Sequence, residues 1–140
     1  MKILNQQIFE NKEAAALPGL MESGGLPALV SGLSGIHRVN LAAALYENLE
    51  LPMFVVCPDD SAAESFTRDL ESMLGRPVNT LYSRDFTFYP SLAASREAEQ
   101  KRLYVLNALR CGESPVTVAT VSALMQRAIP PQTLGKATFT

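Results

Sequence analysis

The sequence predicts an α/β fold: a three-layer, doubly wound and mostly parallel sheet. Short apolar runs alternate along the chain with segments of helical periodicity, and glycine or proline stands at the junctions between them. Strands that are joined through helices pair in parallel, because each crossover returns over a face of the sheet. The length of 140 residues and the hydrophobic content of 47% suit one core of ordinary size.

The N-terminal residues 1–25 are expected to form a helical segment that packs on the domain. Residues 5–17 carry a weak apolar stripe, and Pro18 and Gly19 are expected to end that helix. The α/β domain is predicted over residues 26–140. It opens on an apolar run, a glycine loop and a helical stripe, which is the order strand, loop, helix.

The same unit then repeats along the chain. The expected strands are 26–30, 53–57, 78–82 and 116–119. Ser61 and Glu64 have the spacing of a capping box, which predicts the start of a helix that Gly75 ends. Residues 137–140 resemble the opening of another strand, so the chain is expected to be a fragment of something longer.

Two later helices have their own start and stop residues. Ser95 is expected to cap a helix that runs to Cys111, with Gly112 as its stop. Thr120 is expected to cap a short helix that ends at Pro130 and Pro131. Each of these helices would flank the strand at 116–119.

Charge and cysteine content narrow the function classes. With 12 basic and 14 acidic residues, the net charge of −2 gives no overall field that would attract nucleic acid. No stretch reaches the length of a signal peptide or a membrane span, which predicts a cytoplasmic location without membrane partners. Cys57 and Cys111 share no CxxC spacing and are expected to be reduced, buried thiols.

The loop after the first expected strand has the position of a phosphate-binding loop. In open α/β sheets, this first turn usually holds phosphate, and the working motif is GxxxxGK[ST]. With Gly32 as the first glycine, the second glycine falls on His37, the lysine on Arg38 and the hydroxyl residue on Val39. The fold is therefore expected to be of the P-loop NTPase and helicase (RecA-like) kind, with a degenerate Walker A loop.

These substitutions remove the chemistry of the motif. Val39 has no hydroxyl for Mg²⁺, and Arg38 is a planar fork where a compact ammonium is needed. The degenerate loop, listed in full, is Gly32, Ser34, Gly35, His37, Arg38 and Val39. We expect no catalytic residue, no metal ligand and no bound cofactor in this chain. The alternative for these residues is an ordinary turn that needs its glycines for geometry alone.

Several segments keep a common order and spacing over roughly residues 15–140: Gly32–Gly35, Val55–Pro58, Arg84–Pro90, Arg102–Leu106 and Thr120–Arg127. Together they resemble the N-terminal module of the bacterial transcription-repair coupling factor family (Mfd). That module is itself similar to the first domain, domain 1a, of the excision-repair helicase UvrB.

The resemblance implies a non-catalytic scaffold and regulatory module. Proteins of that family displace stalled RNA polymerase by ATP-driven translocation on double-stranded DNA and recruit UvrA for nucleotide excision repair. ATP and Mg²⁺ then belong to a separate motor module, and this chain would contact other modules of the same polypeptide. The interval 85–90 is too short for the damage-probing hairpin of UvrB, so Phe86, Phe88 and Tyr89 are expected to pack against the sheet.

Two other functions remain open. A small P-loop kinase or NTPase would need an acidic Mg²⁺ ligand after a later strand, and only Asp59 and Asp60 follow a strand in this way. A binding domain for an unrelated partner is the other alternative. A DNA-binding stripe is not favoured, since acidic residues interleave the basic ones of one helix, which are Arg96, Lys101, Arg102 and Arg110.

Overall fold

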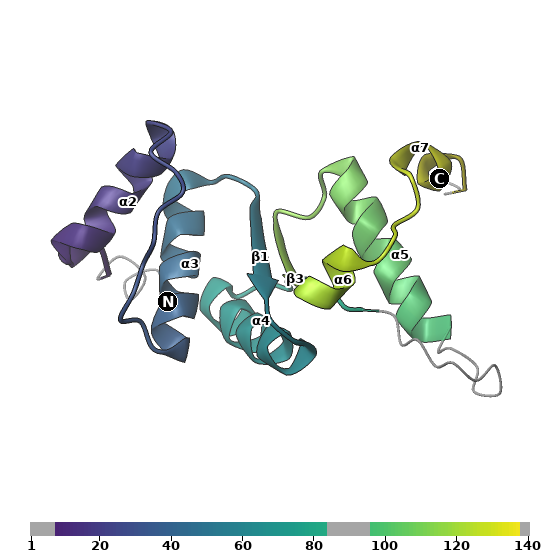
Figure 1. Cartoon of the computed structure of the whole chain (residues 1–140), viewed down its shortest axis with the longest axis horizontal. Coiled ribbons are helices and arrows are strands. Elements are labelled where there is room, and N and C mark those ends of the chain that lie inside the picture. Colours follow the sequence, from purple (N-terminus) through teal and green to yellow (C-terminus); the bar gives the residue numbers. More distant parts are fainter. Residues whose placement is uncertain (1–7, 84–95, 138–140) are drawn as a thin grey trace. The chain divides into compact units, whose positions relative to one another are not determined.

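The computed structural model describes residues 8–83 and 96–137 and confirms a mixed α/β chain with parallel strands (Figure 1). The chain divides into two compact units, and each is described by itself. One unit comprises residues 1–52 and 68–77, and the other comprises 53–67 and 78–140. The predicted boundary at residue 25 stays a prediction.

The second unit contains a parallel sheet of three strands in the order β1-β3-β2. The strands are β1 (Met53–Cys57), β2 (Asn79–Leu81) and β3 (Val116–Thr120). Both β1 and β2 pair in parallel with β3, so the last of the three strands in the sequence lies in the middle. All five residues of β3 are buried. Its β-branched composition suits a position that is covered on both faces.

The two faces of this sheet are covered by different helices. The helices that contribute to this unit are the first half of α4 (Asp60–Leu74), α5 (Arg96–Cys111), α6 (Val121–Met125) and α7 (Pro131–Ala137).

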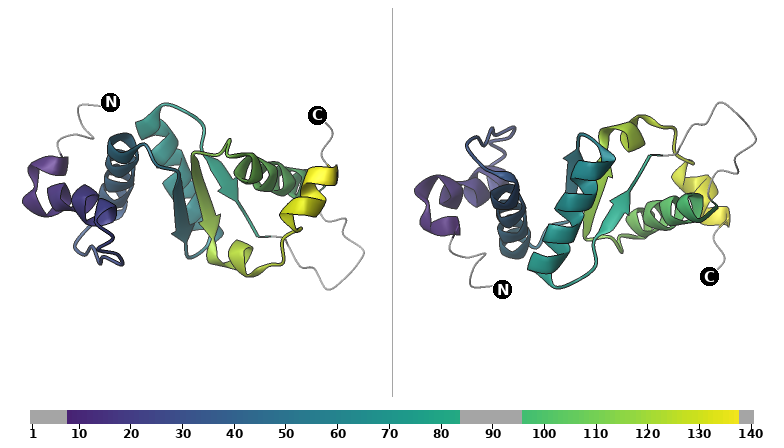
Figure 2. Two further views of the ribbon diagram at one scale, coloured as in Figure 1. Left: turned by 90° about the horizontal axis from the view of Figure 1, so that it is seen from above. Right: turned by 90° about the horizontal axis from the view of Figure 1, so that it is seen from below.

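Neighbouring residues of β2 show which helix covers which face. The hydroxyl oxygens of Thr80 and Thr67, the latter on α4, lie 2.9 Å apart. The next residue, Leu81, packs in a buried cluster with Val105 of α5. Successive side chains of a strand point to opposite faces. The first half of α4 and α5 therefore lie on opposite sides of the sheet (Figure 2).

The N-terminus of α4 differs from the prediction. The helix begins at Asp60, and the Asp59 side chain accepts a hydrogen bond of 2.8 Å from the backbone N–H of Ala62. The predicted capping box of Ser61 and Glu64 is therefore wrong. Asp59 is an equally good cap residue and stands nearer the end of the preceding strand, so the helix begins earlier.

The cap of α6 is confirmed, but its predicted end is wrong. The Thr120 hydroxyl accepts a hydrogen bond of 3.2 Å from the backbone N–H of Ala123. The helix ends at Met125, and Pro131 opens the separate helix α7 instead of closing this one. Proline is tolerated at a first helical position because the N–H that it lacks would have no helical partner there.

Helix α5 ends as predicted and carries an exposed ion pair. Gly112 follows it with a φ of +73°, a left-handed conformation that glycine adopts readily. The carboxylate of Glu97 and the ammonium of Lys101 lie 2.8 Å apart and form an ion pair one helical turn apart. This contact lowers the pKa of Glu97 and raises that of Lys101. The predicted cap, Ser95, lies outside the described residues.

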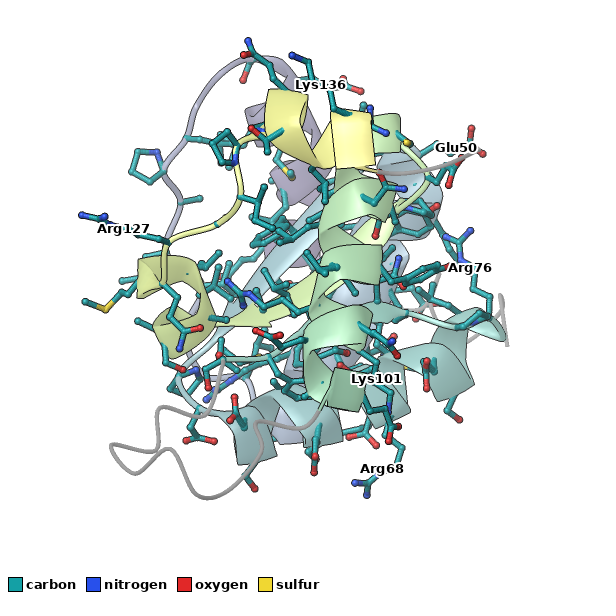
Figure 3. The ribbon with its side chains drawn as sticks, turned by 90° about the vertical axis from the view of Figure 1, so that its right-hand side faces the viewer. Glu50, Arg68, Arg76, Lys101, Arg127 and Lys136 are labelled. Atoms are coloured by element: carbon teal, nitrogen blue, oxygen red, sulfur yellow. The ribbon has the colours of Figure 1, made fainter. Side chains whose placement is uncertain are left out.

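The basic side chains of the second unit form no stripe where they are labelled in Figure 3. Lys101 on α5, Arg127 after α6 and Lys136 on α7 project outward from different elements. Whether α5 contacts DNA stays a prediction.

Arg102 on α5 is buried, unlike Lys101 and Arg110 of the same helix. Only 4% of Arg102 is exposed. Its Nη1 donates to the backbone carbonyl of Tyr82 at 2.7 Å, and its Nη2 donates to that of Ala123 at 3.1 Å. The guanidinium therefore joins the end of β2 to α6. Arg102 lies three residues before the buried Val105, so both fall on the inner stripe of the helix.

The other unit contains a short 3₁₀ helix, η1 (Ile8–Glu10), and the helices α2 (Lys12–Glu22) and α3 (Gly35–Leu49). The predicted helix end at Pro18 and Gly19 is wrong, because Pro18 lies inside α2. A proline removes one hydrogen bond, and here the helix continues to Glu22, after which Gly24 takes a φ of +75°.

The predicted strand at 26–30 is not formed. These residues have no regular structure, and the side chain of Leu29 is 94% exposed. Pro27 provides a physical reason, because it lacks the N–H that a strand in a sheet would donate. The expected order of strand, loop and helix is thus reduced to loop and helix at this place.

The two thiols occupy different environments. Cys57 is buried, as predicted, whereas the prediction for Cys111 is wrong because that residue is exposed. Burial raises the pKa of the Cys57 thiol, and the negative charge of Asp59 raises it further. The raised pKa keeps Cys57 protonated to a higher pH than an ordinary thiol.

We expect Ellman's reagent to modify Cys111 rapidly and Cys57 slowly in the folded protein, because the thiolate is the reactive form and access limits its reaction. The Cys111→Ser variant should lose the rapid phase, and the matched Cys57→Ser variant should keep it. Modification of Cys57 should accelerate only when the pH rises above the range of an ordinary thiol. A rapid phase that persists in Cys111→Ser would contradict the assignment.

Candidate phosphate-binding loop

The loop before α3 keeps the glycine-dependent turn that the sequence predicts. Gly32 has a φ of +79°, in the left-handed region that glycine favours. Ser34 is the N-cap residue of α3 with an extended backbone, and Gly35 is the first residue of the helix. The structure thus brings the two glycines and Ser34 together at the N-terminus of a helix of 15 residues.

The polar side chains of this loop contact the loop itself. The Ser34 hydroxyl lies 2.8 Å from Nδ1 of His37 and makes no capping hydrogen bond to the helix backbone. Nε of Arg38 donates to the carbonyl of Leu33 at 3.2 Å. His37 and Arg38 stand where the motif would face a phosphate group. Their side chains instead contact Ser34 and Leu33 of the same turn.

The helix also begins too early for the motif. In a P-loop, the residues between the two glycines form the curled loop, and the helix follows the motif. Here Gly35 and the residues after it are helical, and the N–H of Arg38 already donates to the carbonyl of Ser34 at 3.1 Å. Fewer backbone N–H groups are left free to surround a phosphate group.

Val39 stands where the motif places its magnesium-binding hydroxyl. The side chain has no oxygen, and the residue is 2% exposed. A side chain at this position is held in the interior rather than presented at the loop. What remains at the turn is a helix N-terminus with an exposed histidine and arginine, which is a weak electrostatic attraction for an anion. Whether these residues bind any phosphate stays a prediction.

The acidic residues of the rival hypothesis have structural contacts. The carboxylate of Asp59 caps α4, as described above. Asp60 accepts a hydrogen bond of 3.5 Å from the Ser83 hydroxyl. Within residues 8–83 and 96–137, no group of three or more His, Cys, Asp or Glu side chains could hold a metal ion.

Some of the predicted residues cannot be placed. The segment Arg84–Pro90, with Phe86, Phe88 and Tyr89, lies outside the described residues. By contrast, sequence reasoning missed the clamp that Arg102 forms between β2 and α6. Its spacing of three from Val105 is the signal that would have placed it on the inner side of the helix.

Comparison with known proteins gives one informative likeness. The chain is 32% identical over 135 residues to the transcription-repair-coupling factor of Bacillus subtilis (strain 168). The alignment covers 92% of this chain. The chain is related to a transcription-repair coupling factor. No protein-family model matches the chain, and no solved structure matches it either.

The chain spans 11% of the length of this coupling factor. The likeness therefore supports the expected relationship to the coupling factor family, whereas the correspondence to domain 1a of UvrB stays a prediction. In the part of the chain that the structure describes, no helix is long and apolar enough to cross a membrane.

Proposed function

We propose that this chain is a non-catalytic scaffold and regulatory module of a transcription-repair coupling factor. The observation that carries the proposal is the alignment with a coupling factor over nearly the whole chain. Its partners would be other modules of the same polypeptide. UvrA, RNA polymerase and double-stranded DNA would be engaged by the complete protein, whose motor module would use ATP and Mg²⁺.

The loop before α3 supports the non-catalytic part of the proposal. Phosphoryl transfer depends on positioned positive charge and a bound metal ion. Here the arginine donates to its own loop, and the position of the metal-binding hydroxyl is a buried valine. A small kinase or NTPase, the alternative function, would have to obtain both groups from elsewhere.

Isothermal titration of the protein with ATP and Mg²⁺ tests this proposal. We expect no measurable heat of binding up to about millimolar ATP, which corresponds to a binding free energy weaker than about −4 kcal/mol. We also expect no release of inorganic phosphate above the rate without protein. The reason is the absence of both a metal ligand and a free lysine at the loop.

The Arg38→Ala and Asp59→Asn variants provide the controls for residual binding. If weak nucleotide binding is seen, its loss in Arg38→Ala alone would indicate a vestigial anion site at the helix N-terminus. Micromolar ATP affinity accompanied by turnover would refute the scaffold proposal. Loss of that turnover in Asp59→Asn would instead favour the NTPase alternative.

A further inference from the structure

The edge strand β1 of the sheet in the second unit lacks the residues that usually protect such an edge. β1 consists of Met53, Phe54, Val55, Val56 and Cys57, and among the described residues it pairs with β3 alone. Edge strands of soluble proteins are commonly protected by charged residues, proline or a covering element. β1 contains neither a charged residue nor a proline.

The backbone of this strand presents two residues to the open edge. The N–H of Met53 donates to the carbonyl of Pro115 at 2.8 Å, so Met53 faces the neighbouring strand. Backbone groups alternate in direction along a strand, which turns Val55 and Cys57 to the same side and Phe54 and Val56 outward. The outward N–H and C=O groups have the geometry to pair with one more strand.

The side chains of Phe54 and Val56 are also exposed to solvent. Phe54 is 46% exposed and Val56 is 51% exposed, whereas their register partners in β3, Thr117 and Ala119, are both 0% exposed. Register partners in a sheet point to the same face. The covering layer over β3 therefore stops before it reaches β1.

Helix α6 carries further exposed apolar residues on the same side of the sheet. Its Ala123 belongs to the buried cluster that contains Ala119, the register partner of Val56, so α6 packs on the same face of the sheet. The apolar residues of α6 that remain exposed are Val121, Leu124 and Met125, the last at 82%. We call Phe54, Val56 and these three residues the β1–α6 surface. Exposed apolar side chains that gather on one side of a domain are typical of interaction sites.

We propose that the β1–α6 surface binds a β-strand and its apolar flank from a part of the same longer polypeptide that lies outside residues 1–140. The proposal rests on the proposed function, because it takes the chain to be one module of a coupling factor. The related coupling factor supplies ample chain for this purpose, since this sequence spans only 11% of it.

A second copy of the chain is the alternative occupant for this edge. Symmetric pairing of two β1 strands would run antiparallel, because the same residues must oppose each other on both copies. The sedimentation experiment described below distinguishes a second copy from a strand of the longer polypeptide.

Hydrogen exchange followed by mass spectrometry tests the proposal. The 140-residue protein is compared with the full product of its own reading frame, with a peptide that covers Met53–Cys57 as the readout. We expect the amides of this peptide that exchange readily in the short protein to exchange about tenfold more slowly, or slower still, in the full product, because pairing and burial protect them. A peptide that covers Val116–Thr120 is the control and should be protected in both.

Four outcomes would overturn the proposal. Equal exchange of the β1 peptide in both proteins would show that the rest of the polypeptide leaves the surface open, and it would leave the proposed function standing. Protection already present in the monomeric short protein would show that residues 1–140 cover it themselves. Self-association in sedimentation experiments that Phe54→Ser abolishes would identify a second copy as the occupant. A reading frame that ends near residue 140 would overturn this inference and the proposed function together.

Discussion

Replacement of Arg102 by alanine is expected to lower the free energy of unfolding by about 3 kcal/mol. The guanidinium is buried and donates to the carbonyls of Tyr82 and Ala123, so its removal leaves two carbonyl groups without these donors and opens a space beside α6. The change should be measured by urea unfolding, followed by circular dichroism at the helical band.

Two variants make the result for Arg102 interpretable. Arg102→Lys keeps the charge but lacks the fork that reaches both carbonyls, so its loss of stability should be intermediate. Arg127→Ala removes an exposed arginine that follows α6 and should change the free energy of unfolding by less than about 0.5 kcal/mol. If Arg102→Ala were as stable as Arg127→Ala, the guanidinium would not be the clamp that its contacts indicate.

Replacement of Leu81 by alanine is expected to cost about 3 kcal/mol. Leu81 is 4% exposed and belongs to the cluster with Val105, Ala119 and Ala123. Two of these partners are alanines, whose short side chains cannot move to fill the space that a missing leucine leaves. The same urea unfolding experiment measures the loss.

The matched control for Leu81 is Leu124→Ala on α6. This leucine is 47% exposed, so the same chemical change should alter the free energy of unfolding of the 140-residue protein by less than about 1 kcal/mol. Similar losses for the two variants would contradict the distinction between the buried cluster and the open surface.

Elements with strong local signals were predictable from the sequence. The strands at 53–57 and 116–119 are short β-branched or apolar runs, and the structure places β1 and β3 there with nearly the same bounds. The stop at Gly112 and the cap at Thr120 also follow local rules that need no knowledge of the rest of the fold.

The features that the sequence did not predict depend on competition between residues of similar propensity or on contacts between residues that are distant in the sequence. The run at 26–30 is apolar enough for a strand, but a strand also needs a partner and a free N–H at each pairing position, which Pro27 does not offer. The cap of α4 was misplaced because Asp59 and Ser61 are both good caps, and the sequence alone does not rank them. The role of Arg102 depends on carbonyls about twenty residues away in either direction.

The candidate loop was predictable at the level of residue identity and less so at the level of geometry. The substitutions at His37, Arg38 and Val39 are read directly from the sequence. The contact between Ser34 and His37 and the early start of α3 at Gly35 depend on how the turn folds, which local propensities leave open. Both features add to the reasons for expecting no nucleotide chemistry here.

The central place of β3 has a consequence for synthesis on the ribosome. β1 and β2 have no pairing with each other, and each has β3 as its neighbour. A nascent chain that has emerged only as far as β2 therefore holds two strands without the partner that joins them, and it must wait for residues 116–120 before the ladders of this sheet can form. During that interval, the early helices of the described part of the chain can close their hydrogen bonds locally, whereas β1 stays open on both sides to any other chain that it meets on leaving the exit tunnel.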